Sequence, residues 1–497
     1  MNRLHTIAAA LACTLVAAVV AACGGTTKAG VSGEAGASLI RSGALAYVAI
    51  DSDLDSSQWQ QVDELLKKFP AHDRWLADLR RELPAGITYD DDIAPALGPE
   101  VDVAVGEATA AETSFVVLTK PDSVDKARAL VRKLASQDDE QPATRVVDGW
   151  FVVSKSQAMI DRTLKGDAAE SLADDTTFKD AVAKLPDDAL AKAYVNGRQL
   201  GELADQVLGS GAKTAAAGGA LPYGLDKIDW IAASLAAKEN GVRFELAVKG
   251  EGGSSLVNGG PSYASKLISG VPSGSLAFLS FRGGSLGDQL KELRRNPTFG
   301  QAFQEAEKQL GMRLDEVIEL FAHEVAFYVR KGPGIPEFSL VLEAPDTQQA
   351  LTTIDRLAGR IAELAHTGGV RKSTENGLDV SSIEIKPVTI RWAGFDGRVL
   401  LTTGPTGIDD YRADGPKLAD DPDYKHALDA AGAPDENGGV IYVNLHDSVQ
   451  LIKNYLGISG ERMPREIAEN LEPLQSLVAY NATDGDLTRT VAFLEIK

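Results

Sequence analysis

The chain repeats itself, and this repeat constrains its fold more than any other feature. Segments of the first half return in the same order in the second half: Ser42–Tyr47 as Ser273–Phe278, Gly149–Val153 as Gly397–Leu401, and Tyr194–Asn196 as Tyr442–Asn444. Preserved order with drifting spacing indicates a tandem duplication with changed loop lengths. We therefore expect two copies of one unit, residues 42–250 and 263–497, joined by a Gly/Ser-rich linker at 251–262.

Within each half, the hydrophobic period switches between two, typical of strands, and 3.6, typical of helices. Residues 45–50 and 115–119 have the strand pattern, and an apolar stripe from Val124 to Leu134 has the helical pattern. Asp148-Gly149 is a strong hairpin signal, repeated as Asp396-Gly397. Hairpins outnumber βαβ crossovers, so we predict an α+β fold of two tandem units. Each unit is expected to be a mainly antiparallel sheet with helices on one face.

The first residues have the build of a secretory signal peptide: Arg3 precedes an uncharged Ala- and Val-rich run. Residues Val20–Gly24 resemble the lipobox of bacterial lipoproteins. That resemblance implies cleavage after residue 22 and a diacylglycerol on Cys23, which would anchor the protein to the outer face of a membrane. Residues 23–41 are rich in Gly, Ser and Ala, which predicts a flexible tether.

Charge and cysteine content exclude several kinds of function. The net charge of −21 argues against nucleic-acid binding and against adsorption of the folded part to anionic lipid. The sequence has two cysteines, and Cys13 would leave with the signal peptide. An acylated Cys23 would then leave no thiol for a disulfide, a nucleophile or zinc. The histidines are isolated, so we predict neither a metal site nor a cofactor.

A few short motifs suggest catalysis or ion binding, each beside a simpler structural interpretation. Gly283–Gly287 fits the G-x-S-x-G pattern, which makes Ser285 a candidate nucleophile. The fold expected here lacks the parallel sheet of a nucleophile elbow, so a loop with a capping serine is favoured. Ser123 begins an S-x-x-K motif but also precedes a helix. The acidic run at 90–92 could bind calcium, although a helix start explains it as well.

Three repeated segments resemble an uncharacterised family of bacterial envelope proteins, a domain of unknown function. They are the Gly-x-Leu-Ala-Tyr/Phe opening strand, the Glu-Val strand, and the Leu-Ala-Asp-Asp stretch followed by Tyr-Val-Asn, and the resemblance spans roughly residues 42–497. It implies an envelope location and a fold, but no activity. We therefore expect a membrane-anchored extracytoplasmic lipoprotein that binds or scaffolds and is not an enzyme. One alternative is a carrier of lipid or another apolar ligand, and another is a serine hydrolase that uses Ser285.

Overall fold

The computed structural model describes residues 30–497, except residues 32, 85, 110–111, 137–140, 167–168, 209–224, 251–260, 285–296, 334 and 459. The predicted signal peptide, Cys23 and Ser285 therefore lie outside the described residues, as does most of the predicted linker. Among the helices that the structure does describe, none is long and apolar enough to cross a bilayer.

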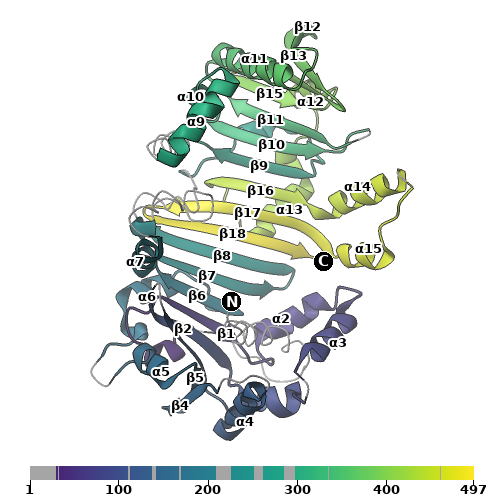
Figure 1. The fold of residues 1–497 in the computed structure, drawn as a ribbon. Helices are drawn as coiled ribbons and strands as arrows, with labels where there is room; N and C mark the ends of the chain where they lie inside the picture. Colours follow the sequence, from purple (N-terminus) through teal and green to yellow (C-terminus); the bar gives the residue numbers. More distant parts are fainter. Residues whose placement is uncertain are drawn as a thin grey trace.

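One antiparallel sheet of 18 strands runs through the structure (Figure 1). The strands of the first half are β1 (Ala46–Asp51), β2 (Glu100–Ala108), β3 (Thr113–Thr119), β4 (Ala143–Val147), β5 (Trp150–Ser154), β6 (Ala191–Asn196), β7 (Ile228–Lys238) and β8 (Gly241–Gly250). Those of the second half are β9 (Ala277–Arg282), β10 (Glu324–Arg330), β11 (Glu337–Glu343), β12 (Arg371–Glu375), β13 (Leu378–Ile385), β14 (Val388–Phe395), β15 (Arg398–Thr402), β16 (Gly439–Asn444), β17 (Leu474–Asp484) and β18 (Leu487–Ile496).

The strands pair in the same order in both halves. The first half runs β4-β5-β3-β2-β1-β6-β7-β8, and the second runs β14-β15-β11-β10-β9-β16-β17-β18 with the hairpin of β12 and β13 added outside β14. The halves meet where β8 pairs with β18, from Leu487↔Lys249 to Glu495↔Gly241. The sheet is therefore continuous across the middle of the molecule.

Helices border the sheet, and several of them begin at a residue whose side chain caps the helix. They are α2 (Ser57–Leu66), α3 (His72–Glu82), α4 (Val124–Ala135), α5 (Gln157–Thr163), α6 (Thr176–Val182), α7 (Gly197–Leu208), α9 (Pro297–Leu310), α10 (Leu314–Glu319), α11 (Thr347–Leu364), α12 (Gly407–Arg412), α13 (Pro422–Ala431), α14 (Leu445–Ile458) and α15 (Arg465–Leu471). Asp175 caps α6 and Asp421 caps α13, each accepting two backbone amides, and Pro422 fills the first position of α13. Ser123 caps α4, as its position predicts.

Short helices cover one face of the sheet with matching aromatic clusters. Phe178 of α6 packs edge-on between Tyr47 and Tyr194, at centroid distances of 5.7 and 5.1 Å. Tyr424 of α13 lies between Phe278 and Tyr442 in the same way, at 6.1 and 5.0 Å. We call this side of the sheet the covered face. Directly opposed residues of paired strands point to the same side, so the register identifies every other residue on it.

The prediction of helices on one face only is wrong for the outer strands. Leu130 of α4 packs in a core with Phe151, and Ile354 of α11 packs in a core with Trp392, on the side away from α6 and α13. The physical reason lies in the outer strands themselves. Trp150–Val153 of β5 is apolar at every position, so both of its sides need a covering layer.

The structure also corrects the predicted tether. Residues Gly36–Leu39 form the 3₁₀ helix η2, and Ala37, Leu39 and Ile40 are buried in the core of the first half. A Gly- and Ala-rich composition is typical of a flexible tether, but small residues also allow a segment to pack closely against a sheet, so composition alone did not distinguish the two. The hairpin prediction is confirmed: Asp148 and Gly149 both have positive φ, as do Asp396 and Gly397.

Candidate functional site

The site residues expected from sequence motifs do not come together in the described part of the chain. Cys23 and Ser285 lie outside it, and Ser123 is a helix cap. The acidic run at 90–92 begins a helical turn in which Asp92 pairs with Lys133. The described residues contain no group of three His, Cys, Asp or Glu side chains able to hold a metal ion.

A different feature stands out: the side of the sheet opposite the covered face is apolar and open in the centre. Leu235 of β7, Phe244 of β8 and Ile441 of β16 are 39%, 42% and 43% exposed. These three residues belong to one row that crosses the sheet with directly opposed residues. The row is Val101, Ile50, Ala191, Leu235, Phe244, Ala492, Ala479, Ile441, Leu279, Phe327 and Leu340. Every one of these residues is apolar.

Two flanking rows on the same side are also uncharged. One contains Val103, Val48, Ala193, Ala233, Leu246, Thr490, Asn481, Gly439 and Phe281. The other contains Ala237, Val242, Leu494, Leu477, Val443, Ala277, Val329 and Phe338. The two polar side chains in these rows form a hydrogen bond with each other: the Thr490 hydroxyl donates to Asn481 Oδ1 at 2.8 Å. In the last row, Ala237, Val242 and Leu494 pack in a cluster with Leu65 of α2 and are therefore covered. We call the row that contains Phe244 and Ile441, together with the row that contains Thr490 and Asn481, the open face.

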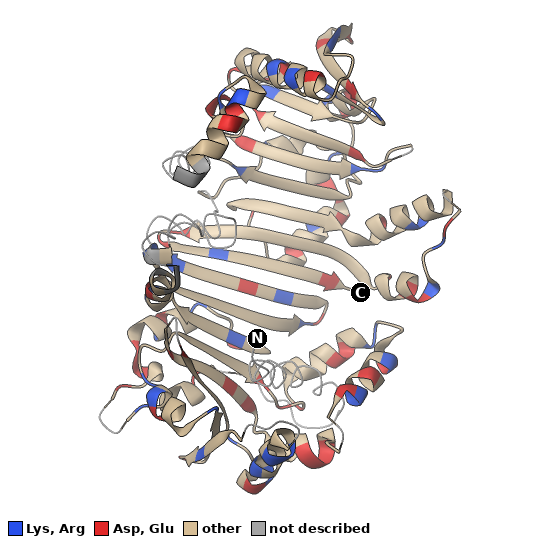
Figure 2. Ribbon diagram, viewed as in Figure 1, with Lys and Arg blue, Asp and Glu red and all other residues tan. Residues whose placement is uncertain are grey.

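The charged residues of the central strands lie on the covered face instead. Arg243 and Arg489 both bind Glu245, at 2.5 and 3.0 Å, and Glu245 is 6% exposed. Glu495 accepts from His426 of α13 at 2.8 Å. Acidic and basic residues are sparse along the central strands in Figure 2, and the register turns these away from the open face. In a half-buried strand, charged residues normally face water and apolar residues face the covering layer. In these central strands the charged residues face the covering helices and the apolar residues face water.

Helices stand at the ends of the central strands and leave their middle bare. Figure 1 shows α2, α3, α14 and α15 at one end and α7 at the other, with the middle of β7, β8 and β18 between them. The first group joins the two halves: Asn470 of α15 accepts the amide of Ala71 at 2.9 Å, and Arg74 pairs with Glu466. A contiguous exposed apolar surface inside a polar border is typical of a binding site.

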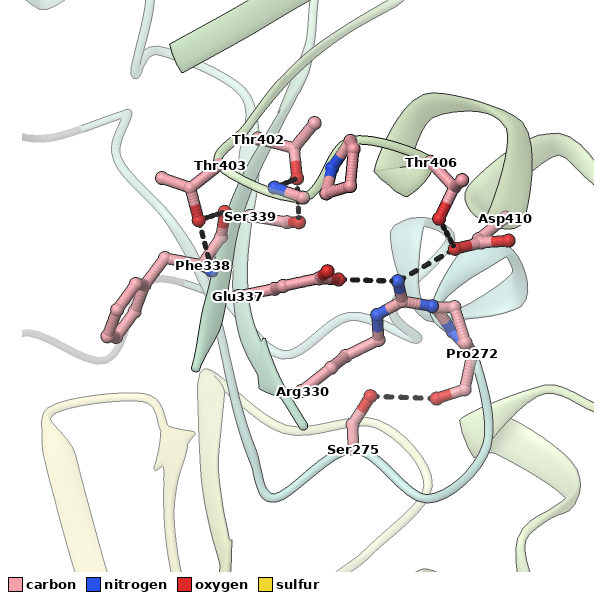
Figure 3. A network of polar contacts seen from close by, with 12 residues as sticks. Pro272, Ser275, Arg330, Glu337, Phe338, Ser339, Thr402, Thr403, Thr406 and Asp410 are labelled. Atoms are coloured by element: carbon pink, nitrogen blue, oxygen red, sulfur yellow. Dashed lines mark hydrogen bonds and ion pairs between the residues drawn. The ribbon is translucent and has the colours of Figure 1, made fainter. Parts of the chain in front are cut away.

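A polar network on the covered face of the second half is closed on itself and so makes a poorer candidate (Figure 3). Arg330 donates to Glu337 and to Asp410, each at 2.7 Å, and Thr406 donates to Asp410 at 2.8 Å. Burial raises the pKa of Asp410, but the hydrogen bonds from Thr406 and Arg330 outweigh it and hold that pKa below its usual value. The network joins β10, β11 and α12, which is a structural role.

Comparison with solved structures gives only remote likenesses. A structure described as crystal form IV of TP0453 matches with a TM-score of 0.26 and 12% identity, over 46% of this chain and 81% of that one. Crystal form III of TP0453 matches with a TM-score of 0.25 and 12% identity, over 46% and 78%. A search of curated proteins gives no match. A family model described as protein of unknown function (DUF3352) matches residues 129–496, most of the chain, and the protein belongs to this family.

Proposed function

We propose that this protein is a lipid-anchored extracytoplasmic binding protein, without catalytic activity, that holds the acyl chains of an amphiphile on the open face. The observation that supports this most directly is the unbroken apolar row from Ile50 through Phe244 and Ile441 to Phe327. Covering such side chains is worth about 25 cal/mol for each Å² removed from water. A ligand that supplies apolar surface and needs no polar contacts fits this face.

The lack of polar groups favours acyl chains over a protein partner. Protein interfaces carry roughly one hydrogen bond per 100–200 Å² and a polar rim. On the open face the strand backbones are already paired, and Thr490 and Asn481 satisfy each other. The small side chains of Ala492 and Ala479 lie in the row between the larger Phe244 and Ile441. An extended acyl chain could lie over these alanines along β18 and β17.

The test is to measure binding of a fluorescent long-chain fatty acid to the full chain and to a Phe244→Glu, Ile441→Glu variant. We expect at least a tenfold loss of affinity, because each carboxylate would have to lose water beside the acyl chain. Leu364→Glu is the matched control, since Leu364 is 58% exposed and belongs to α11, which covers the outer strands and not the central ones. Equal binding by all three proteins would refute the assignment of this face.

Mass spectrometry of the purified full chain adds an independent readout. We expect co-purifying lipid in the wild type and in Leu364→Glu, and its loss in the double variant. A water-soluble protein recovered in place of lipid, and lost in the same double variant, would make the open face a protein-docking surface and overturn the lipid assignment.

Anchoring is a separate proposal that depends on Cys23. Cys23→Ser should move the protein from the membrane to the soluble fraction, because two acyl chains provide a stable anchor and a net charge of −21 repels anionic lipid. Fractionation in high salt is the measurement, and the Phe244→Glu, Ile441→Glu variant, which keeps Cys23, is the control. A Cys23→Ser protein that still sediments with membranes would rule out this anchor.

We also infer that the two halves arose by tandem duplication. Support comes from the repeated pairing order, from the Asp-Gly hairpins at corresponding places, and from the Asp caps of α6 and α13. In this view the junction of β8 with β18 is where the two copies share one sheet. The open face then spans both copies, so the ligand would lie across their junction.

A further inference from the structure

The covered face of the first half carries three buried acids where β1 pairs with β2. Asp51 lies opposite Glu100, and Asp102 lies opposite Ala49 on the same side of the sheet. These acids are 2%, 8% and 0% exposed. A group of acids this well buried demands an explanation, because an ionised carboxylate without a partner is very costly inside a protein.

The second half shows what one of these acids does. Glu324 holds the position of Glu100, with Arg282 opposite it, and it is fully buried. It accepts the hydroxyl of Ser265 at 2.5 Å and the amides of Lys266 and Leu267 at 2.9 and 3.2 Å. One carboxyl group thus fastens the segment that leads into the 3₁₀ helix η9 (Leu267–Gly270).

The first half uses the same device with one carboxyl more. Burial raises the pKa of Glu100, and the amides of Gly33 and Gly36, which face its carboxyl, oppose that rise. Through these amides Glu100 fastens the segment that contains η2, as Glu324 fastens its own segment. Asp102, however, stands where the second half has Ala326. Gly36 stands at the start of η2, where the start of η9 has Leu267. A Cβ on residue 36 would overlap the Asp102 carboxylate, so this carboxyl occupies room left by a glycine.

Among the described residues, neither oxygen of Asp102 makes a hydrogen bond of good geometry, and the polar groups that interact with this carboxyl are the Tyr47 hydroxyl and the Glu100 carboxyl. The Tyr47 hydroxyl is itself buried and likewise makes no hydrogen bond of good geometry in that part of the chain. Burial raises the pKa of Asp102 well above its usual value, and the charge of Glu100 raises it further. Asp102 is therefore the member of the group that stays protonated.

The surrounding charges can balance one carboxylate but not two. The positive charge that interacts with Glu100 is that of Lys192 on β6. This charge is shared, because three more acids also interact with Lys192: Glu34, Asp187 and Asp188. Asp51, beside Glu100, accepts from Ser56 at 2.6 Å and from the amide of Asp53 at 3.0 Å, and burial raises its pKa to about 7. Tyr47 adds no charge, because burial and Asp102 raise its pKa as well. A second negative charge at Asp102 would stand uncompensated.

We propose that Asp102 and Glu100 together bind one proton, and that this proton keeps the N-terminal segment, residues 30–41, fastened to the sheet. Losing the proton places two carboxylates under Gly36, and the segment lifts so that Asp102 reaches water. The lifted state binds the proton less tightly, so the fastened state is favoured at low pH and is lost as pH rises through the raised pKa. The same segment leads to Cys23, so its release would lengthen the link to the anchor. This proposal does not depend on what the open face binds.

The test is hydrogen exchange of the full chain, read by mass spectrometry from pH 5 to pH 9 and corrected for intrinsic exchange rates. We expect the protection of amides 33–40 to fall by up to tenfold per pH unit as pH rises toward the raised pKa, and to level off above it, as release of one proton on lifting requires. Amides 265–271 are the internal control, because Ala326 stands where the first half has Asp102. The carboxylate of Glu343, beside Glu324 on β11, is partly exposed and pairs with Lys266, so the protection of this segment should stay flat.

Two variants complete the experiment. Asp102→Asn keeps the shape and removes the titration, and Asp102→Ala copies the second half; both should abolish the fall in protection at residues 33–40. A fall of equal size in either variant, or equal falls in both segments of the wild type, would overturn the proposal. So would protection that rises on adding sodium or calcium at constant pH, because the ligand would then be a cation.

Discussion

Glu324→Ala is expected to lower the free energy of unfolding by about 3 to 5 kcal/mol, because it removes a buried acceptor and leaves its donors without a partner. The amides of Lys266 and Leu267 and the hydroxyl of Ser265 would lose their partner where water does not reach. Each such donor costs about 1 to 3 kcal/mol. The new cavity beside Ser280 adds to the loss, since Ser280 also donates to Glu324.

Urea denaturation followed by circular dichroism measures this change through the midpoint. Glu343→Ala is the matched control: Glu343 is a neighbouring carboxylate whose ion pair with Lys266, at 3.7 Å, is partly exposed. We expect that control to lose less than about 1 kcal/mol. If Glu324→Ala is as mild as Glu343→Ala, the carboxylate does not fasten the segment.

Asp102→Ala combined with Gly36→Leu should have the opposite sign and raise the free energy of unfolding by about 1 to 3 kcal/mol at neutral pH. The pair reproduces Leu267 and Ala326, which are both buried in one apolar cluster of the second half. It removes a buried carboxyl and fills the space with a side chain. Gly36→Leu alone should be destabilising, since any Cβ there overlaps the Asp102 carboxylate as well as the end of the Leu118 side chain; in the double variant only that terminal methyl of Leu118 has to move aside. The two substitutions are therefore strongly non-additive.

The same comparison predicts a pH dependence. A folded-state pKa above the unfolded value of about 3.9 means that the unfolded chain releases its proton first. Stability of the wild type should therefore fall as pH rises from about 4 toward the raised pKa, and the double variant should lose this contribution. Unfolding midpoints at several pH values test it. A variant less stable than the wild type at every pH would show that Asp102 contributes net stability.

The sequence predicted local structure well where one physical rule decides it. Asp148-Gly149 adopts the positive φ angles of a tight hairpin, and Ser123 caps its helix. The apolar stripe of α4 packs into a core through Ala127 and Leu130. These features depend on neighbours in the sequence, which is why pattern and spacing suffice to find them.

The open face escaped prediction because its strands invert the usual pattern. In β8 the charged positions Arg243 and Glu245 alternate with Phe244 and Leu246, which would normally place Phe244 in the core. In the structure Phe244 is exposed and Glu245 is buried by two arginines from neighbouring positions of the sheet. Only the pairing of β8 with β18, across more than 200 residues of sequence, supplies Arg489, and no local pattern reveals that pairing.

The junction of β8 and β18 has a consequence for how the chain assembles. β18 follows every other strand in the sequence, yet it pairs along its length with β8 in the middle of the sheet. Until β18 is in place, β8 presents an unpaired edge beside the exposed Phe244, which is a template for pairing with another chain. Long-range strand pairing of this kind forms slowly. We therefore expect the chain to be most prone to aggregation after the first half has folded and before β18 has paired with β8.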